Sequence, residues 1–222
     1  FIGGNNEIGL AIVMTIPLLN YLRTVATRKW VRLSLLVSMM LCATAALGTQ
    51  SRGALLAILA MVAVLWFRSK NKAGSAIGLT VFATLLVGFM PQSWWSRMET
   101  IGDYQEDASA MGRINAWLMA FKLAKNQFFG GGFEIYNAHI FGMFAPDPTD
   151  IHAAHSIYFQ VLGEHGWVGL FLFLGVFFSA MAIAGKIRKE SAKQPEAQWL
   201  YQLAGMCQVS LVGYAVGGAL LS

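Results

Sequence analysis

The feature that most constrains this chain is a series of six apolar segments, several of which reach or approach the length of a membrane span. A helix needs about 20 apolar residues to cross about 30 Å of hydrocarbon, and only helices or closed barrels satisfy their backbone polar groups there. We therefore expect an all-α protein, a polytopic transmembrane helix bundle in which the shorter segments extend or tilt. The segments cover approximately Ile8–Leu22, Val31–Leu47, Ala54–Phe67, Ser75–Met90, Trp167–Ala184 and Trp199–Leu221.

The composition supports a membrane protein over a soluble one. Hydrophobic residues make up 56% of the chain and charged residues 12%, which is too apolar for an ordinary soluble domain. In a soluble protein the net charge of +5 could indicate nucleic acid, but here Lys and Arg cluster between apolar segments, a pattern typical of membrane topology. We expect a lipid bilayer as partner and no nucleic acid. Cys42 and Cys207 lie within apolar segments and are expected to be buried thiols.

The basic connections give one consistent orientation. They follow the first, third and fifth segments, so the positive-inside rule places all three in the cytoplasm. The first 90 residues then form four spans, residues 91–165 form a large loop on the opposite side, and residues 166–222 form two spans. Because the chain begins and ends within apolar segments, we expect it to be part of a larger protein. The basic residues are Arg23, Arg28, Lys29, Arg32, Arg68, Lys70, Lys72, Lys186, Arg188, Lys189 and Lys193.

The long polar loop carries signals for short helices. Apolar residues recur with helical spacing across Arg113–Lys125, which predicts an amphipathic helix on the membrane or the bundle, with Asp107 or Ser109 as its cap. The apolar positions are Ile114, Trp117, Leu118, Phe121, Leu123 and Ala124. A second helix is expected from Ala153, with a pause at 164–166 before the next span. The glycines at 130–132 suit a helix stop, or the close approach of a ligand.

Two arginines and a histidine are the candidate site residues. Arg52 stands where a helix should begin, and a guanidinium at a helix N-terminus suits an anion such as phosphate. The alternative is an arginine that extends to a lipid headgroup. Arg113 opens the predicted loop helix on the same side of the membrane. His155 could serve as a general base near neutral pH, or it could only cap a helix or bond a loop carbonyl.

Other groups in the loop are secondary candidates. His152, Glu164 and Tyr158 are possible supporting residues, with His152 the alternative base and His139 and His165 weaker ones. A metal site formed by Asp147, Asp150, His152 and His155 is less favoured, because its spacing is not that of a helix-face pair. A serine hydrolase is disfavoured because the sequence contains no Gly-x-Ser-x-Gly motif.

Three motifs in order resemble the O-antigen ligase and polymerase superfamily. The first is Ser51-Arg52-Gly53-Ala54-Leu55-Leu56, and the second is Gly112-Arg113 followed by Trp117, Ala120 and the glycines at 130–132. The third runs from Ala154-His155-Ser156-Ile157-Tyr158-Phe159-Gln160 through Gly163-Glu164-His165-Gly166 to Gly169. Asn5-Asn6-Glu7 with Val13-Met14-Thr15-Ile16-Pro17 is similar to the exosortase A-associated O-glycosylation ligase branch. The resemblance covers nearly the whole chain but only the later half of a typical member.

The resemblance implies a multi-pass glycosyltransferase of the bacterial inner membrane whose 91–165 loop is periplasmic and catalytic. Such an enzyme moves a glycan from an undecaprenyl-pyrophosphate carrier to an acceptor hydroxyl on lipid A core, a polysaccharide or a protein. In this scheme Arg52 and Arg113 hold the pyrophosphate, His155 is the base, and no cofactor or metal is needed. Two rivals stay open: a polymerase of the same superfamily, and a polytopic transporter. The transporter is disfavoured because the segments carry almost no mid-span charge.

Overall fold

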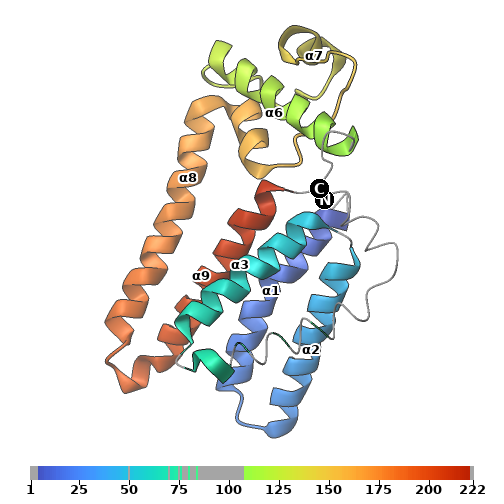
Figure 1. Cartoon of the computed structure of the whole chain (residues 1–222). Coiled ribbons are helices and arrows are strands. Elements are labelled where there is room, and N and C mark those ends of the chain that lie inside the picture. The colour runs from blue at the N-terminus through green and yellow to red at the C-terminus, as the bar shows by residue number, and fades with distance from the viewer. Residues whose placement is uncertain are drawn as a thin grey trace. The chain divides into compact units, whose positions relative to one another are not determined.

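The computed structural model describes residues 5–49, 51–69, 71–74, 76, 80, 84 and 108–220, and these residues form helices and connections without strands (Figure 1). The all-α prediction is confirmed for them. The elements are α1 (Asn5–Val25), α2 (Lys29–Gly48), α3 (Arg52–Arg68), α6 (Ala108–Asn126), α7 (Ala138–Phe144), α8 (Ile157–Ser191), the 3-10 helix η1 (Pro195–Ala197) and α9 (Gln198–Ala219).

Helices of the described chain agree with five of the six apolar segments. α1, α2, α3, α8 and α9 contain or nearly coincide with them. Of these helices, α1, α2 and α8 are long and apolar enough to cross a membrane, and α3 has 17 residues. The segment predicted at Ser75–Met90 lies almost entirely outside the described residues, as does Asp107. The number of spans and the side on which each loop lies therefore stay predictions.

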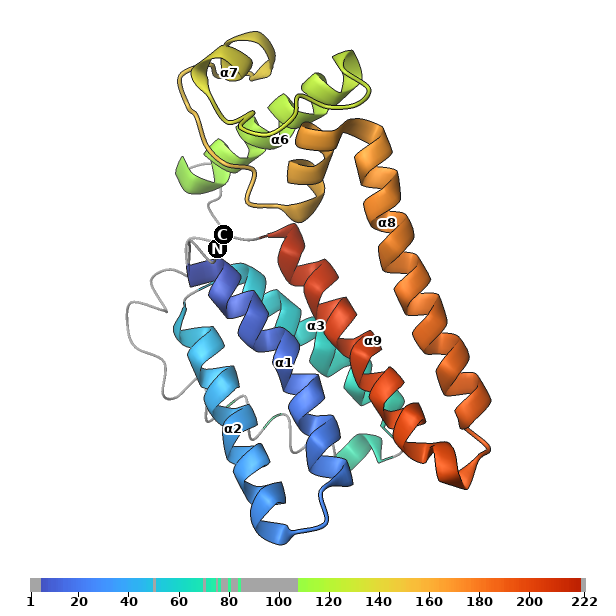
Figure 2. The same cartoon turned by 180° about the vertical axis from the view of Figure 1, so that it is seen from behind.

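The chain divides into two compact units. The first takes its described residues from Phe1–Ser96 and Ala180–Gly217 and contains α1, α2, α3, the end of α8 and nearly all of α9. In this unit α1 lies beside α2 and α3 (Figure 2). Small side chains allow this close packing, as they do between membrane helices generally. The core consists of Leu10, Val13, Ala46, Ala54, Ala57, Met61 and Val209. The Ser210 hydroxyl donates to the Met14 carbonyl at 2.6 Å and ties α9 to α1.

The second unit comprises mainly the described part of Arg97–Ser179, with α6, α7 and the start of α8. The predicted loop helix is confirmed, because α6 contains all of Arg113–Lys125. The predicted stripe is confirmed only in part, since Leu123 and Ala124 are buried whereas Leu118 and Phe121 are both 44% exposed. The packed face of α6 meets α7 and the segment near Ile135. The core of this unit is Ala116, Met119, Leu123, Ile135 and Phe141.

Two glycine segments pair along their backbones in the second unit. Gly131 N–H donates to Gly163 O and Gly132 N–H to Glu164 O, both at 2.9 Å, and Trp167 N–H donates to Phe128 O at 3.1 Å. A Cβ at Gly130 or Gly166 would overlap the opposite backbone. The glycines therefore allow close packing of backbone against backbone, and the helix stop predicted for them is found before them, at Asn126.

The predicted pause before the fifth apolar segment is confirmed at Gly166. This residue has φ 64° and ψ −161° inside α8, a conformation open essentially only to glycine. The start of the helix differs from the prediction, because α8 begins at Ile157 and residues 151–156 are extended or irregular. Beyond the kink, α8 exposes a row of large apolar side chains, as expected of a helix that contacts lipid: Phe171, Leu172, Val176, Phe178 and Ile183.

Candidate functional site

Arg52 begins a helix, as predicted. It is the first residue of α3, and the preceding Ser51 caps that helix, since its hydroxyl accepts a hydrogen bond from Ala54 N–H at 3.2 Å. A capped first turn presents the positive end of the helix dipole beside the guanidinium. Arg52 belongs to the first unit, and Arg113 and His155 belong to the second. That Arg52 and Arg113 converge on one anion therefore stays a prediction.

Arg113 lies inside its helix and not at its start. α6 already includes Ala108, so Arg113 is beyond its first turn, and Ser109 lies within the helix and not before it as a cap. The sequence placed the start too late because the apolar repeat becomes clear only after Arg113. Arg113 is only 7% exposed. Burial of an arginine is costly unless the guanidinium is paired, and Arg113 does interact with other groups.

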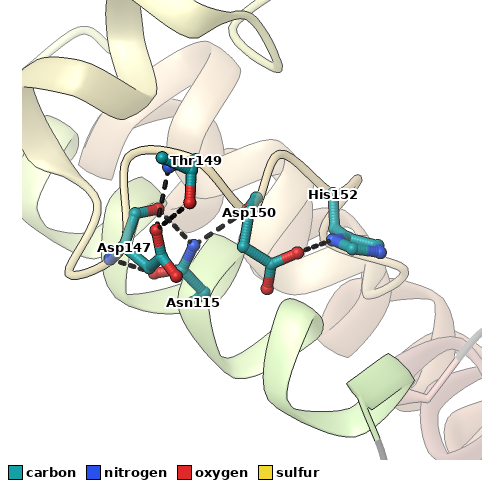
Figure 3. Close-up of polar contacts among 5 residues, drawn as sticks. All are labelled: Asn115, Asp147, Thr149, Asp150 and His152. Atoms are coloured by element: carbon teal, nitrogen blue, oxygen red, sulfur yellow. Dashed lines mark hydrogen bonds and ion pairs between the residues drawn. The ribbon is translucent and has the colours of Figure 1, made fainter.

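An amide on α6 holds the 147–150 loop against the helix. Asn115 Nδ2 donates to the carbonyls of Asp147 at 2.8 Å and Asp150 at 2.9 Å, and Asp147 N–H donates to Asn115 Oδ1 at 2.9 Å (Figure 3). Asp147 also accepts from the Thr149 hydroxyl at 2.7 Å and from Thr149 N–H at 2.9 Å. These two bonds hold the pKa of Asp147 below its usual value, the hydroxyl having the larger effect. The loop is therefore held in place by its hydrogen bonds to α6.

His152 is paired with a carboxylate and lies against α6 at Gly112. Its Nδ1 lies 2.7 Å from Asp150 Oδ1 (Figure 3). The ring also lies so close to α6 that a Cβ at Gly112 would be 2.6 Å from Nδ1. Gly112 precedes Arg113, so its lack of a side chain lets the histidine approach this part of the helix. A carboxylate that accepts from one ring nitrogen fixes the tautomer and leaves the other nitrogen available.

His155 stands in an unusual backbone conformation. Its φ is 46°, in the left-handed region, and its side chain is half-buried. The preceding residue is anchored from α6, because Trp117 Nε1 donates to Ala154 O at 2.6 Å. Trp117 also stacks on Phe159 with ring centroids 5.0 Å apart. Such backbone conformations cost about 1–3 kcal/mol, persist where surrounding contacts impose them, and cluster at functional sites.

Two supporting candidates lie on the first turns of α8. Glu164 is largely shielded and accepts from Gln160 Nε2 at 3.2 Å, and its carboxylate is 3.8 Å from His165 Nε2. Tyr158 is half-buried and packs edge to face on Phe173 with centroids 6.1 Å apart. Within the described residues, no three His, Cys, Asp or Glu side chains form a cluster that could hold a metal ion. The metal alternative for Asp147, Asp150, His152 and His155 is therefore unsupported.

Tyr136 and Asn115 are site residues that the sequence did not indicate. The Tyr136 hydroxyl is buried, and its pKa is raised by that burial and then by the charge of Glu164. Because it adjoins Glu164 and the backbone at Ala154, it lies close to the segment that carries His155. Both residues contact partners that are distant in the sequence. No local spacing pattern could have found them.

The second unit thus contains most of the predicted site residues, namely Arg113, His152, His155, Tyr158 and Glu164. One face of α6, with Arg113 and Trp117 one turn apart, lies along the segment that carries His152 and His155. Comparison with known families matches residues 36–174, more than half of the chain, to the family described as O-antigen ligase. The matched range contains Arg52, Arg113 and His155. Neither the curated proteins nor the solved structures give a significant match.

Proposed function

This chain belongs to the O-antigen ligase family, and from that premise we propose that it transfers a glycan from undecaprenyl pyrophosphate to an acceptor hydroxyl. Family membership implies a membrane glycosyltransferase of the ligase or polymerase type. We further propose the donor, the class of acceptor and the residues that act on them. The acceptor hydroxyl belongs to lipid A core, a polysaccharide or a protein. We place the reaction at the periplasmic face of the bacterial inner membrane. The exosortase A-associated branch remains a prediction.

The proposed chemistry needs no group beyond the chain and its substrates. The acceptor oxygen forms a bond to the anomeric carbon of the glycan, and the bond from that carbon to the pyrophosphate oxygen breaks. The hydroxyl proton passes to His155, and the carrier leaves as undecaprenyl pyrophosphate. Arg52 and Arg113 stabilise the negative charge that develops on the leaving pyrophosphate, for which bidentate guanidinium groups are well suited. Hydrophobic helices accommodate the lipid tail of the carrier.

The family match over residues 36–174 is the observation that carries the proposal. The structure supports it at one point, since Trp117, one turn after Arg113 on α6, donates to the carbonyl of Ala154, the residue before His155. Leaving-group stabilisation requires a cation and proton removal requires a base, and Arg113 and His155 are the candidates for these two roles. The His152–Asp150 pair supplies the alternative base in the same region.

Reconstituted transfer is the direct test. The purified protein is mixed with a lipid-linked oligosaccharide and separate acceptors, and the products are identified by mass. We expect the glycan to appear on an acceptor hydroxyl with release of undecaprenyl pyrophosphate. Longer glycans still attached to the carrier would instead indicate the polymerase. Movement of intact donor across sealed vesicles without a new glycosidic bond would indicate a transporter and contradict the proposal.

His155 requires substitutions that suit its backbone. Asparagine and glycine both tolerate a positive φ, whereas alanine would add strain to the loss of the imidazole. We expect His155→Asn and His155→Gly to reduce transfer about 10²–10⁴-fold, the usual contribution of a positioned base, with donor binding and membrane insertion retained. Near-normal transfer by either variant would remove His155 from the mechanism.

The pH profile separates a base from a cationic clamp at position 155. A base acts in its neutral form, so the rate should rise with pH as the imidazole loses its proton. A clamp acts as a cation and should lose activity over the same range. We expect the rising profile for the wild type and its loss in His155→Asn. Retention of the rising limb in His155→Asn would move the base to another residue, with His152 the first alternative.

A further inference from the structure

Two arginines converge on one amide oxygen in the first unit. Arg68 Nη2 and Arg188 Nη1 donate to Gln208 Oε1 at 2.9 and 3.1 Å. The first arginine ends α3, the second is in the last turn of α8, and the glutamine is in α9. Gln208 is 7% exposed, and its Nε2 donates to Met181 O at 3.1 Å. The amide therefore joins three helices and holds two guanidinium groups close together.

The positive charges of this pair are not balanced within the described part of the chain. The ion pairs found there join other residues: His152 with Asp150, His165 with Glu164, and Lys186 with Glu190. The other acceptors of the two arginines are neutral, namely Gly205 O for Arg68 and the Tyr201 hydroxyl for Arg188, each at 3.1 Å. Like charges held together repel one another and are costly to desolvate.

The arrangement leaves hydrogen-bond donors unused. A guanidinium has five N–H donors, and each of these arginines uses two of them. Arg188 Nε is buried and has no hydrogen-bond partner, while the Arg188 guanidinium stacks on the Tyr201 ring at 4.9 Å. The Arg68 side chain is exposed, so the pair can be reached from outside the protein. Unused donors, excess positive charge and access together suit an oxyanion.

We propose that Arg68 and Arg188, joined by Gln208, bind the phosphate group of an anionic phospholipid. The site lies at the ends of α3 and α8 that carry the basic connections, which the positive-inside rule assigns to the cytoplasmic side. That leaflet is rich in anionic lipid, and basic pockets between helices there bind phosphate headgroups. This site is independent of the proposed transfer reaction, whose residues are predicted to lie on the opposite side.

The test compares the whole protein in nanodiscs of neutral phosphatidylcholine with discs that also contain phosphatidylglycerol. We expect the anionic lipid to raise the unfolding midpoint by about 2–4 °C. Gln208→Glu is the informative variant, because it keeps the side-chain shape and gives both arginines an internal counter-charge. It should raise the midpoint in neutral discs and remove the further gain from phosphatidylglycerol. Arg28→Gln, which alters an exposed arginine outside the pair, should keep the gain.

Three outcomes would overturn the assignment. The first is a wild type that gains nothing from phosphatidylglycerol, and the second is a Gln208→Glu protein that keeps the full gain. The third is inorganic phosphate that reproduces the gain in neutral discs, since it would assign the site to a soluble anion and not to lipid. Arg68→Gln with Arg188→Gln should also remove the gain if the double variant folds, and Gln208→Glu decides the matter if it does not.

Discussion

At the scale of single residues, Arg113 tests whether geometry or charge alone matters at the site. Arg113→Lys keeps the charge but loses the planar fork that binds pyrophosphate through two parallel bonds. Hydrogen bonds to charged groups contribute about 1.5–3 kcal/mol, so we expect transfer to fall roughly 10–100-fold. Lys122→Arg, the reverse exchange at an exposed position of α6, should leave the rate unchanged. The measurement is kcat/KM for the lipid-linked donor.

The melting temperature decides what a loss at Arg113 means, because this side chain is buried. If the melting temperature of Arg113→Lys falls together with its transfer rate, the loss of transfer is assigned to packing. Transfer close to the wild-type rate in Arg113→Lys would contradict a bidentate contact. Arg52→Lys tests the same idea at the start of α3, and both variants should reduce transfer if the two arginines hold one pyrophosphate.

At the residue level the sequence selects rare charged side chains in a distinctive setting, and their catalytic roles stay predictions. Arg52 and Arg113 stand out as charges beside apolar sequence, and Arg52 does begin a capped helix. Asn115 and Tyr136 were missed because their partners are distant in the sequence. Asn115 bonds to Asp147, 32 residues away, and Tyr136 lies near Glu164. Neither interaction leaves a periodic pattern. The role of His155 stays a prediction, and its positive φ, next to the Trp117 bond to Ala154, left no signal in the sequence.

At the scale of elements, the glycine pairing between residues 128–132 and 163–167 should be a main determinant of stability in the second unit. Gly166→Ala adds a Cβ to a conformation that strains any other residue and would overlap the opposite backbone. We expect a loss of at least 1–3 kcal/mol, the approximate cost of such backbone strain alone. Gly142→Ala in α7 is the matched control, because a Cβ there meets nothing within 4 Å.

The measurement is thermal or denaturant unfolding of the two glycine variants in the same detergent. Gly142→Ala should be neutral or slightly stabilising, since alanine favours a helix over glycine. A Gly166→Ala protein as stable as Gly142→Ala would contradict the close approach of the two segments. A loss of transfer in Gly166→Ala larger than its loss of stability explains would show in addition that the kink positions the residues near His155.

Helix prediction was accurate in the apolar segments and weaker in the loop for a physical reason. α1, α2 and α8 are long runs whose apolar length dictates a helix in lipid. In α6 the predicted Leu123 and Ala124 are buried together with Ala116 and Met119, while Leu118 and Phe121 are exposed. Hydrophobicity alone cannot rank two apolar faces of one helix when either lipid or protein could cover them.

At the scale of the whole molecule, the orientation in the membrane links the two proposed sites. The basic connections after α1, α3 and α8 predict one side, and the segment with His155 is predicted on the other. Lipid-linked glycan and the anionic lipid of the Arg68–Arg188 pair would then occupy opposite leaflets. Transfer activity and lipid-dependent stability should therefore respond to different substitutions. His155→Asn should reduce transfer, Gln208→Glu should remove the lipid-dependent gain in stability, and the double variant should show both effects.

Single cysteines can establish this orientation directly. Gln127, exposed just after α6, and Glu196, exposed in η1, lie in connections predicted on opposite sides of the membrane. Cys42 and Cys207 are free and half-buried, so they are first replaced by alanine. In spheroplasts an impermeant maleimide should label Gln127→Cys at once, and Glu196→Cys only after the membrane is opened. Equal labelling of the two after opening is the control for thiol reactivity. Labelling of Glu196→Cys alone in intact spheroplasts would invert the topology, and a base at His155 would then face the wrong compartment for a periplasmic transfer.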